Sequence, residues 1–207
     1  MDLPGERPGL VPSRAWKQSA FNVAWQQGET LVAAIGQGYV LATPLQLAVL
    51  TARLVNGGYA IRPHLTKQIK QGPAEETVWP AIGVQKRNLD LVVQAMMMVV
   101  NTPQGTAFKA RIMEAGMEMG GKTGTSQVRR ISMAERSTGV VKNEDLPWRE
   151  RDHALFVGFA PIEAPRYAVS VLVEHGGGGS TVAAPIARDL LIECQKRNPA
   201  RPLAGSA

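Results

Sequence analysis

The sequence GGKTGTSQV, residues 120–128, constrains the fold more strongly than any other part of this chain. Residues 116–123 satisfy the G-x-x-x-x-G-K-[ST] pattern of a phosphate-binding loop. Such a loop requires a helix directly after it, because the helix N-terminus supplies the amide donors that hold the phosphate. Residues 124–128, GTSQV, start a helix poorly and are typical of a strand. The pattern therefore predicts a strand around Lys122, and the phosphate loop stays as an alternative.

On a strand, these residues would form two chemically different rows. Side chains alternate between faces, so Lys122 and Gly124 share one face while Thr123 and Thr125 share the other. A lysine can hold its charge beside a nucleophile or an oxyanion, and a glycine lets another group approach the backbone closely. The threonine hydroxyls can hydrogen-bond a carboxylate, and the amide of Thr125 can point at an acyl oxygen. Lys122 is the candidate catalytic residue, and the other three are candidate substrate-binding residues.

Apolar periodicity predicts two helices before this strand. The first begins at Thr43, which can cap it, with Pro44 in the first helical position, and the Asn-Gly-Gly of residues 56–58 ends it. The second covers about residues 87–101 and has one apolar face. Its methionine run, residues 96–98, is interpreted as core packing and not as a set of ligands.

After the lysine strand, the sequence predicts a β-hairpin and a final helix. Residues 153–161 and 167–175 are strand-like and are joined by a turn, so antiparallel pairing is expected. The helix begins with Ser180 or Thr181 as its cap and runs to about Lys196. Its apolar face is expected to contain Ile186, Leu190 and Cys194.

Four segments lack these regular patterns. The first 40 residues, rich in Gly and Pro, are predicted to be irregular. Residues 59–69 are predicted to be a short strand or an extended segment, with Pro63 typical of a sheet edge. Residues 129–152 are highly charged, which indicates a functional lid or a locally disordered loop. Residues 198–207 are predicted to be a disordered tail.

Composition excludes several classes of function. The chain has 207 residues, a formal charge of +6 and a pI near 9.8, which suits an anionic partner, but a solvated basic surface with no dedicated ligand is the preferred interpretation. The basic residues are scattered with few aromatic residues between them, so a nucleic-acid-binding surface is not indicated. No apolar run reaches the roughly 18 residues that a membrane span needs. The single cysteine, Cys194, excludes an internal disulfide and a cysteine-rich metal site, and it is interpreted as a buried small apolar residue.

The order of the predicted elements and several local motifs resemble one known family. The lysine strand, polar loop, hairpin and terminal helix are preceded by IGQGYVLATPLQLAVLTARLVNGG. This arrangement resembles the C-terminal half of the transpeptidase domain of class B penicillin-binding proteins. The motifs DLPGE, WQQGETL, IGQGY, ATPLQLA and GKTGTSQV are similar, more narrowly, to the members that serve cell elongation. The resemblance runs from Asp2 to about Leu191.

This resemblance implies an α+β fold of the serine β-lactamase and transpeptidase type, an antiparallel sheet with helices on both faces. Its members cross-link peptidoglycan: a serine attacks the penultimate D-Ala of a stem peptide, the terminal D-Ala is released, and the acyl group passes from the serine to a neighbouring stem amine. The implied partners are stem peptides ending in D-Ala-D-Ala, β-lactams, and proteins of the cell-elongation complex. No cofactor and no metal ligand are implied for the matching positions. Family members are anchored in the inner membrane with a periplasmic catalytic domain.

The resemblance also assigns roles to matching residues. Lys122 resembles the family lysine that lies between two serines and tunes their proton transfers. Thr123 and Thr125 resemble the carboxylate-binding hydroxyls, the Thr125 amide resembles half of the oxyanion hole, and Gly124 permits close approach. A surface lysine on an edge strand is the alternative interpretation of Lys122. Because the family chemistry uses a lysine, His153 is interpreted as a structural hydrogen-bonding residue, and the other two histidines are given no role.

Two family motifs have no match in this sequence. The nucleophile comes from S-x-x-K and a supporting serine from S-x-N or S-x-D, and none of the eight serines fits either pattern. Residues 106–109 form a T-x-x-K that is interpreted as an ordinary connection. Residues 1–207 are therefore expected to be a C-terminal portion of the domain, without the nucleophile helix and the first strands. We expect exposed apolar surface, an uncovered sheet edge, and no acyl transfer by this chain alone.

Two other functions stay open from the sequence. The run from Gly116 to Thr123 could belong to a nucleotide-binding protein, which a magnesium-dependent affinity for ATP would favour. The chain could also be a non-catalytic scaffold module that keeps the fold for partner proteins of the cell-elongation complex. A complemented chain that binds partners but is never acylated would favour this third function.

Overall fold

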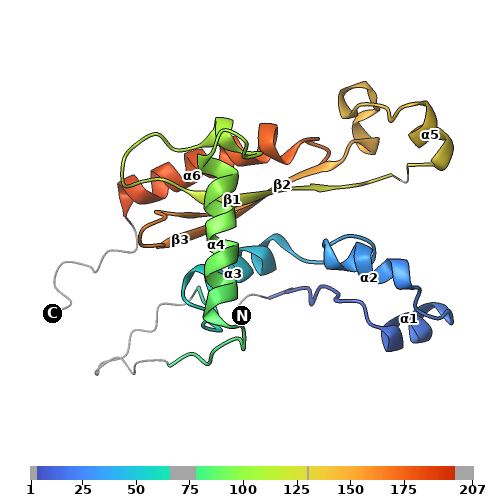
Figure 1. Cartoon of the computed structure of the whole chain (residues 1–207), viewed down its shortest axis with the longest axis horizontal. Helices are drawn as coiled ribbons and strands as arrows, with labels where there is room; N and C mark the ends of the chain where they lie inside the picture. The colour runs from blue at the N-terminus through green and yellow to red at the C-terminus, as the bar shows by residue number, and fades with distance from the viewer. Residues whose placement is uncertain (1–3, 66–77, 130, 199–207) are drawn as a thin grey trace.

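The computed structural model describes residues 4–65, 78–129 and 131–198 (Figure 1). Within them, three strands form one antiparallel sheet in the order β1-β2-β3. The strands are β1 (Gly120–Ser126), β2 (His153–Ala160) and β3 (Tyr167–Val173). The lysine strand and the β-hairpin predicted from the sequence are both confirmed.

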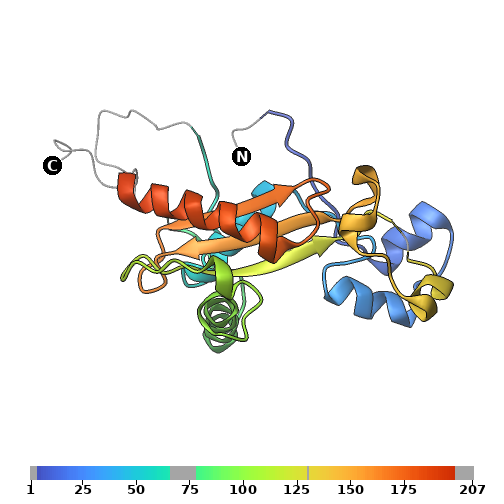
Figure 2. The same ribbon diagram turned by 90° about the horizontal axis from the view of Figure 1, so that it is seen from above.

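Helices cover both faces of this sheet, which confirms the α+β prediction (Figures 1 and 2). Helix α6 (Ala184–Arg197) lies on one face, and α3 (Pro44–Val55) lies on the opposite face; both contact β2 and β3. Helix α4 (Lys86–Asn101) packs against β1 and is seen end-on beside that strand in Figure 2. Among the described residues β1 pairs with β2 alone, so it is an edge strand.

Strand β2 supplies the core on both faces of the sheet. Ala154, Phe156 and Ala160 are fully buried and belong to the same apolar cluster as the inner side chains of α6. Phe159 is also fully buried but points to the opposite face, because neighbouring residues of a strand alternate. Burial of each phenylalanine contributes about 2–3 kcal/mol from the apolar surface removed from water.

The final helix begins differently from the prediction. A π-helical turn, η4 (Gly179–Ala183), leads directly into α6, and no side chain caps the helix. Ser180 and Thr181 lie inside that turn, so the prediction that one of them is the cap was wrong. Proline at the start of α6 needs no amide partner, which allows this uncapped entry.

The buried face of α6 also differs from the prediction. Ala187 and Leu191 are buried, whereas Ile186 and Leu190 are 42% and 48% exposed and Cys194 is half-buried. Small alanines on the inner side let the helix lie close to the sheet, and the larger side chains are turned outward. The apolar stripe through Ile186, Leu190 and Cys194 was therefore the wrong face.

Helix α3 begins and ends where the sequence predicts. Thr43 is the N-cap, and its hydroxyl accepts a hydrogen bond from the backbone N–H of Gln46 at 3.1 Å. The Gln46 side chain accepts one from the Thr43 N–H at 2.9 Å, which completes a capping box. The same side chain donates to the carbonyl of Pro8 at 2.9 Å, so it also holds the N-terminal segment. Asn56 ends the helix.

Helix α4 is confirmed as well, with one difference in its methionine run. It buries Leu89, Met96 and Val100. Met97 is half-buried and Met98 is 59% exposed, so only the first of the three methionines packs fully in the core.

The first 40 residues are not irregular, which corrects the prediction. They contain two short helices, α1 (Arg14–Phe21) and α2 (Gln27–Ala34). The hydroxyl of Ser13 caps α1, and Lys17, only 5% exposed, forms an ion pair with Glu29 of α2. Each helix is about two turns long and lies between glycines and prolines, so neither shows the sustained period by which helices are recognised.

The charged segment between β1 and β2 is also more ordered than predicted. It contains α5 (Met133–Thr138) and two 3₁₀ turns, η2 (Asn143–Asp145) and η3 (Trp148–Glu150). Asp152 joins the turns to the sheet, because its N–H donates to the Asn143 side-chain oxygen at 2.9 Å. The segment is thus a series of short helical turns within its described residues.

Two predictions fall partly outside the described residues. Over residues 59–65 the chain forms a single antiparallel bridge, Tyr59 to Ala81, and no regular strand. Residues 66–69 lie outside the described part, as do residues 199–207 of the predicted tail. Asn198 is the C-cap of α6.

Apolar surface and a sheet edge are open, as expected. Several large apolar side chains are exposed, among them Leu31 on α2, Ile35 directly after α2, and Leu91 on α4. On the other side of the sheet, β3 pairs with β2 alone among the described residues. Both features are sites where another polypeptide segment can pack.

Candidate functional site

Strand β1 places the candidate residues along the edge of the sheet. Lys122 and Thr125 are exposed, and Thr123 is half-buried. Lys122 is paired with Val157, and Thr123 is paired with Phe156. Residues directly opposite each other in an antiparallel pair share a face. Thr123 therefore lies on the face that α6 covers and Lys122 starts from the other, so the two predicted rows of side chains are present.

The two glycines directly before Lys122, of which Gly121 belongs to the phosphate-loop pattern, serve packing. A β-carbon on Gly120 would lie 2.5 Å from the ring of Phe159, and one on Gly121 would lie 2.3 Å from the ring of Phe156. These separations are too short for real contacts, so only glycine fits beneath the two rings. Residues 120–126 form a strand, and α5 begins only at residue 133. The helix N-terminus that a phosphate loop needs is therefore not present at Lys122.

The Lys122 ammonium lies at the outer edge of β1. Its Nζ donates to the carbonyl oxygen of Thr123 at 2.6 Å and lies 3.5 Å from the Thr123 Oγ1. No carboxylate within 4 Å pairs with it among the residues that the structure describes. An ammonium has three donors, so it keeps donors available for a ligand or a second protein segment.

Gly179 lets the start of the C-terminal helix approach the backbone of Gly124 closely. A β-carbon on Gly179 would lie 2.4 Å from the carbonyl oxygens of both Gly124 and Leu155. Gly179 is the first residue of the turn η4 that leads into α6. The start of the terminal helix is therefore in direct contact with the backbone of the candidate site.

Sequence reasoning missed one residue at this site, Thr106. Its Oγ1 lies 3.0 Å from the Oγ1 of Thr123. Thr106 lies between α4 and the 3₁₀ turn η1 (Phe108–Ala110), in the T-x-x-K that was interpreted as an ordinary connection. No local pattern relates a loop residue to a strand 17 positions later, so the sequence offered no signal for this contact.

An ion pair holds the segment that follows β1. The Arg129 guanidinium donates to both carboxylate oxygens of Glu135 on α5, and the two side chains are 22% and 18% exposed. This pairing lowers the pKa of Glu135 from 4.5 to about 2, chiefly through the hydrogen bonds from Arg129. The same contact raises the pKa of Arg129.

The Glu135 ion pair should persist in acid down to about pH 3. Because its folded-state pKa is lowered, the stabilisation is fully present above the ordinary value of 4.5 and is lost as pH falls toward 2. Carbon-13 NMR of the Glu135 carboxyl group, titrated from pH 7 to pH 2, should show a midpoint near 2. In an Arg129→Ala variant the midpoint should return toward 4.5. A wild-type midpoint near 4.5 would contradict the ion pair.

Two histidines meet at the other end of this segment. The Nδ1 of His153 accepts a hydrogen bond from the backbone N–H of His175 at 2.9 Å, and the two rings lie 4.7 Å apart. The His175 Nδ1 lies 3.0 Å from the carbonyl oxygen of Arg151, and its ring lies 4.5 Å from that of Trp148. His153 is thus a structural hydrogen-bonding residue, as interpreted from the sequence. His175 joins the end of the segment to the sheet.

The described residues hold neither a metal-binding cluster nor a membrane-spanning helix. No group of three or more histidine, cysteine, aspartate or glutamate side chains in them could bind a metal ion. None of their helices combines the length and the apolar character needed to cross a bilayer.

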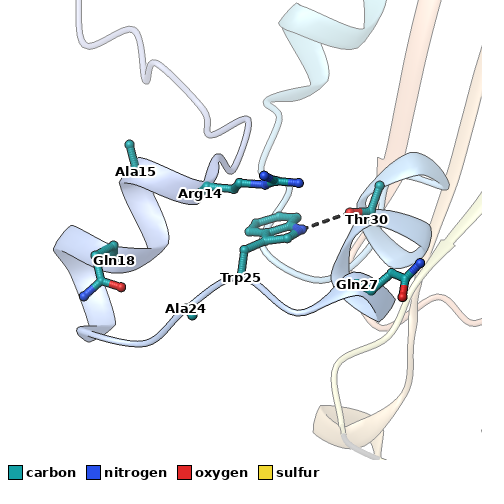
Figure 3. A pocket seen from close by; sticks show the side chains of 7 residues that line it. All are labelled: Arg14, Ala15, Gln18, Ala24, Trp25, Gln27 and Thr30. Carbon is teal, nitrogen blue, oxygen red and sulfur yellow. Dashed lines mark hydrogen bonds between the residues drawn. The ribbon is translucent and has the colours of Figure 1, made fainter.

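A separate hollow of about 760 Å³ lies between α1 and α2 (Figure 3). The indole N–H of Trp25 donates to the hydroxyl of Thr30 at 2.9 Å, which fixes the orientation of the ring. Arg14, Gln18 and Gln27 also line this hollow. None of its lining residues belongs to β1, so it is distinct from the candidate site.

Comparison with known sequences gives one family. Residues 1–192 match the sequence profile described as "Penicillin binding protein transpeptidase domain". The peptidoglycan D,D-transpeptidase MrdA of Salmonella typhimurium is 39% identical over 198 residues. That match covers 92% of this chain and 31% of the relative, so the chain spans about a third of the relative's length.

Solved structures agree with the sequence match. PBP2 from Pseudomonas aeruginosa is 41% identical with a TM-score of 0.75, over 94% of this chain and 40% of that protein. PBP2 from Helicobacter pylori, solved in complex with MreC, is 33% identical with a TM-score of 0.76, over 95% of this chain and 32% of that protein.

Proposed function

We propose that this chain, which belongs to the penicillin-binding protein transpeptidase family, forms one wall of a peptidoglycan D,D-transpeptidase site. The observation that carries the proposal is the edge strand β1 with Lys122 and two threonines alternating across it. Residues 1–207 would be a C-terminal portion of the transpeptidase domain. A serine from a segment not matched in this chain would supply the nucleophile.

Lys122 would act on proton transfer at that serine. Its ammonium lies at the free edge of β1, where it has a backbone acceptor at 2.6 Å and no carboxylate partner among the described residues. A positive charge held there favours the deprotonated form of a nearby nucleophile and stabilises developing negative charge. This geometry supports Lys122 as the catalytic residue of the proposed site.

Thr123 and Thr125 would hold the substrate. Both hydroxyls stand on the same row, suited to the terminal carboxylate of a D-Ala-D-Ala stem peptide or of a β-lactam. The carbonyl of Thr123 accepts from Lys122 Nζ, so its backbone groups have access to the outer edge of the sheet. Residues two apart in an antiparallel strand direct their backbone groups to the same side, so the Thr125 N–H would face the same edge. An amide in that position can stabilise an acyl oxyanion.

We infer the partners and the location of the whole protein from its relatives. The relative named above is a peptidoglycan D,D-transpeptidase, and the Helicobacter pylori relative was solved with MreC. We expect peptidoglycan stem peptides and β-lactams as ligands, and cell-elongation proteins as partners. The catalytic domain would lie in the periplasm, with an anchor in the inner membrane supplied by another segment.

Fluorescent penicillin should leave this chain unlabelled and should label a protein in which the nucleophile is restored. A suitable protein is a chimera in which residues 1–192 replace the matching segment of the Salmonella typhimurium relative. Covalent labelling is read on a denaturing gel, with boiled chimera as the control. Stable labelling of the 207-residue chain would show that its own residues supply the nucleophile. A folded chimera that binds partner proteins but is never labelled would favour the scaffold function.

A further inference from the structure

We propose that Thr106 is a positioning residue that fixes the Thr123 hydroxyl as a hydrogen-bond donor toward a ligand carboxylate. The inference rests on the proposed function for the identity of the ligand, and on the contact between the two hydroxyls for its geometry. Their Oγ1 atoms lie 3.0 Å apart, and Thr106 is itself exposed.

The backbone around Thr106 is held firmly against helix α4. A β-carbon on Gly105 would lie 2.2 Å from the carbonyl oxygen of Val99, so this residue packs directly on the helix backbone. On the other side, the N–H of Ala107 donates to the same carbonyl at 3.0 Å, and Ala107 is 1% exposed. Thr106 therefore projects from a loop that is fixed at both neighbouring residues. A fixed loop can hold a hydroxyl at one position relative to β1.

Either hydroxyl could donate the hydrogen bond between Thr106 and Thr123, and the choice decides where the Thr123 proton points. A threonine hydroxyl has one donor and two acceptor lone pairs. If Thr106 donates to Thr123, the Thr123 proton is free to point at a ligand. Lys122 Nζ, 3.5 Å from the same Thr123 oxygen, favours this arrangement, because a positive charge attracts the lone pairs of that oxygen. A hydroxyl that accepts from one neighbour also donates more strongly to the next group.

The opposite direction would weaken anion binding. If Thr123 donated to Thr106, its only proton would be used within the protein and its lone pairs would face the carboxylate. An approaching carboxylate therefore selects the state in which Thr106 is the donor. Thr106 would then raise affinity for anionic ligands without touching the ligand itself.

Three variants of the 207-residue chain test this. Thr106→Val removes the hydroxyl and keeps the shape, and Thr106 is exposed, so the substitution should not unfold the chain. Thr106→Ser keeps the hydroxyl and is the matched control. Thr123→Val removes the group that is positioned. Amide NMR spectra that overlap with those of the wild type away from residues 106 and 123 establish that each variant is folded.

The first measurement needs no ligand. Three-bond couplings of Thr123 should report a single side-chain rotamer in the wild type and in Thr106→Ser, and an averaged value in Thr106→Val. An unchanged Thr123 coupling in Thr106→Val would overturn the positioning role, whatever the function of the chain.

The second measurement uses N-acetyl-D-Ala-D-Ala and the same dipeptide with a C-terminal amide, each titrated into the chain by NMR. Thr106→Val should raise the Kd for the carboxylate form about fivefold, as loss of one hydrogen bond implies, and should leave binding of the amide form unchanged. Thr106→Ser should restore the affinity. Equal weakening of both ligands would overturn the inference. If the wild-type chain bound neither dipeptide, the ligand assigned here would be overturned, while labelling of the chimera would still decide the proposed function and the rotamer result would still decide the contact.

Discussion

Replacing Lys122 with alanine is expected to lower the rate of penicillin acylation by about 10²–10⁴-fold in a transpeptidase that carries this segment. The side chain is exposed, and its charged end hydrogen-bonds the Thr123 carbonyl at the edge of β1. Its removal should therefore eliminate a positive charge from the site without disturbing the packing of the sheet. The loss should appear in the acylation step, because the threonines that would hold the ligand are unchanged.

The chimera described above allows this to be measured as the rate of covalent labelling by fluorescent penicillin. Lys109→Ala is the matched control, since Lys109 is also an exposed lysine and belongs to the T-x-x-K beside the site. Its rate should stay within about twofold of the wild type, as is usual for a surface substitution. If the Lys122→Ala chimera were labelled at the wild-type rate, Lys122 would have no role in acylation. A large loss in Lys109→Ala would instead implicate the T-x-x-K.

The second large effect concerns stability. Leu191→Ala should destabilise the chain by about 2–5 kcal/mol, the range for truncating a buried leucine. Leu191 is 1% exposed and belongs to the cluster in which α6 packs on Phe156. A loss of about 3 kcal/mol corresponds to a fall in Tm of roughly 6–12 °C in a chain of this size.

Leu190→Ala is the control for this prediction. It changes the same residue type one position earlier on the same helix, but Leu190 is 48% exposed. Its cost should be below about 1 kcal/mol. Chemical denaturation followed by circular dichroism compares the two variants with the wild type. Equal destabilisation by both, or a larger effect of Leu190→Ala, would mean that α6 buries the face expected from the sequence.

The elements that could be predicted are those whose signal is local and repeated. Helix α4 has 16 residues and shows its apolar period over four turns. Helix α3 carries its cap at Thr43 and its end at Asn56 within the sequence itself. The hairpin of β2 and β3 has two runs of strand formers on either side of a turn. In each case, the information lies within a few neighbouring residues.

The elements that were missed depend on contacts across the fold. Helices α1 and α2 have eight residues each, and an ion pair between Lys17 and Glu29 holds them together. The buried face of α6 depends on how closely the helix approaches the sheet, which alanines such as Ala187 decide. Hydrophobicity alone favours the larger side chains, so it selected the wrong face.

The candidate site shows both situations. The alternation of Lys122 and Thr123 follows from the strand period, so it could be predicted. Gly121, the second glycine of the phosphate-loop pattern, is needed because the ring of Phe156 lies against it, and that reason is visible only once β2 is paired with β1. The hydroxyl of Thr106 reaches the site through the packing of its loop on α4, for which the sequence has no periodic signal.

The contact between Gly179 and Gly124 has a mechanical consequence. The two backbones touch with no side chain between them, so no rotamer change can absorb a displacement of either segment. A shift of α6 along or across the sheet is then passed directly to the strand that carries the lysine. Substitutions on the outer surface of the terminal helix, remote from any reacting atom, should therefore be able to alter the acylation rate of the chimera by displacing β1.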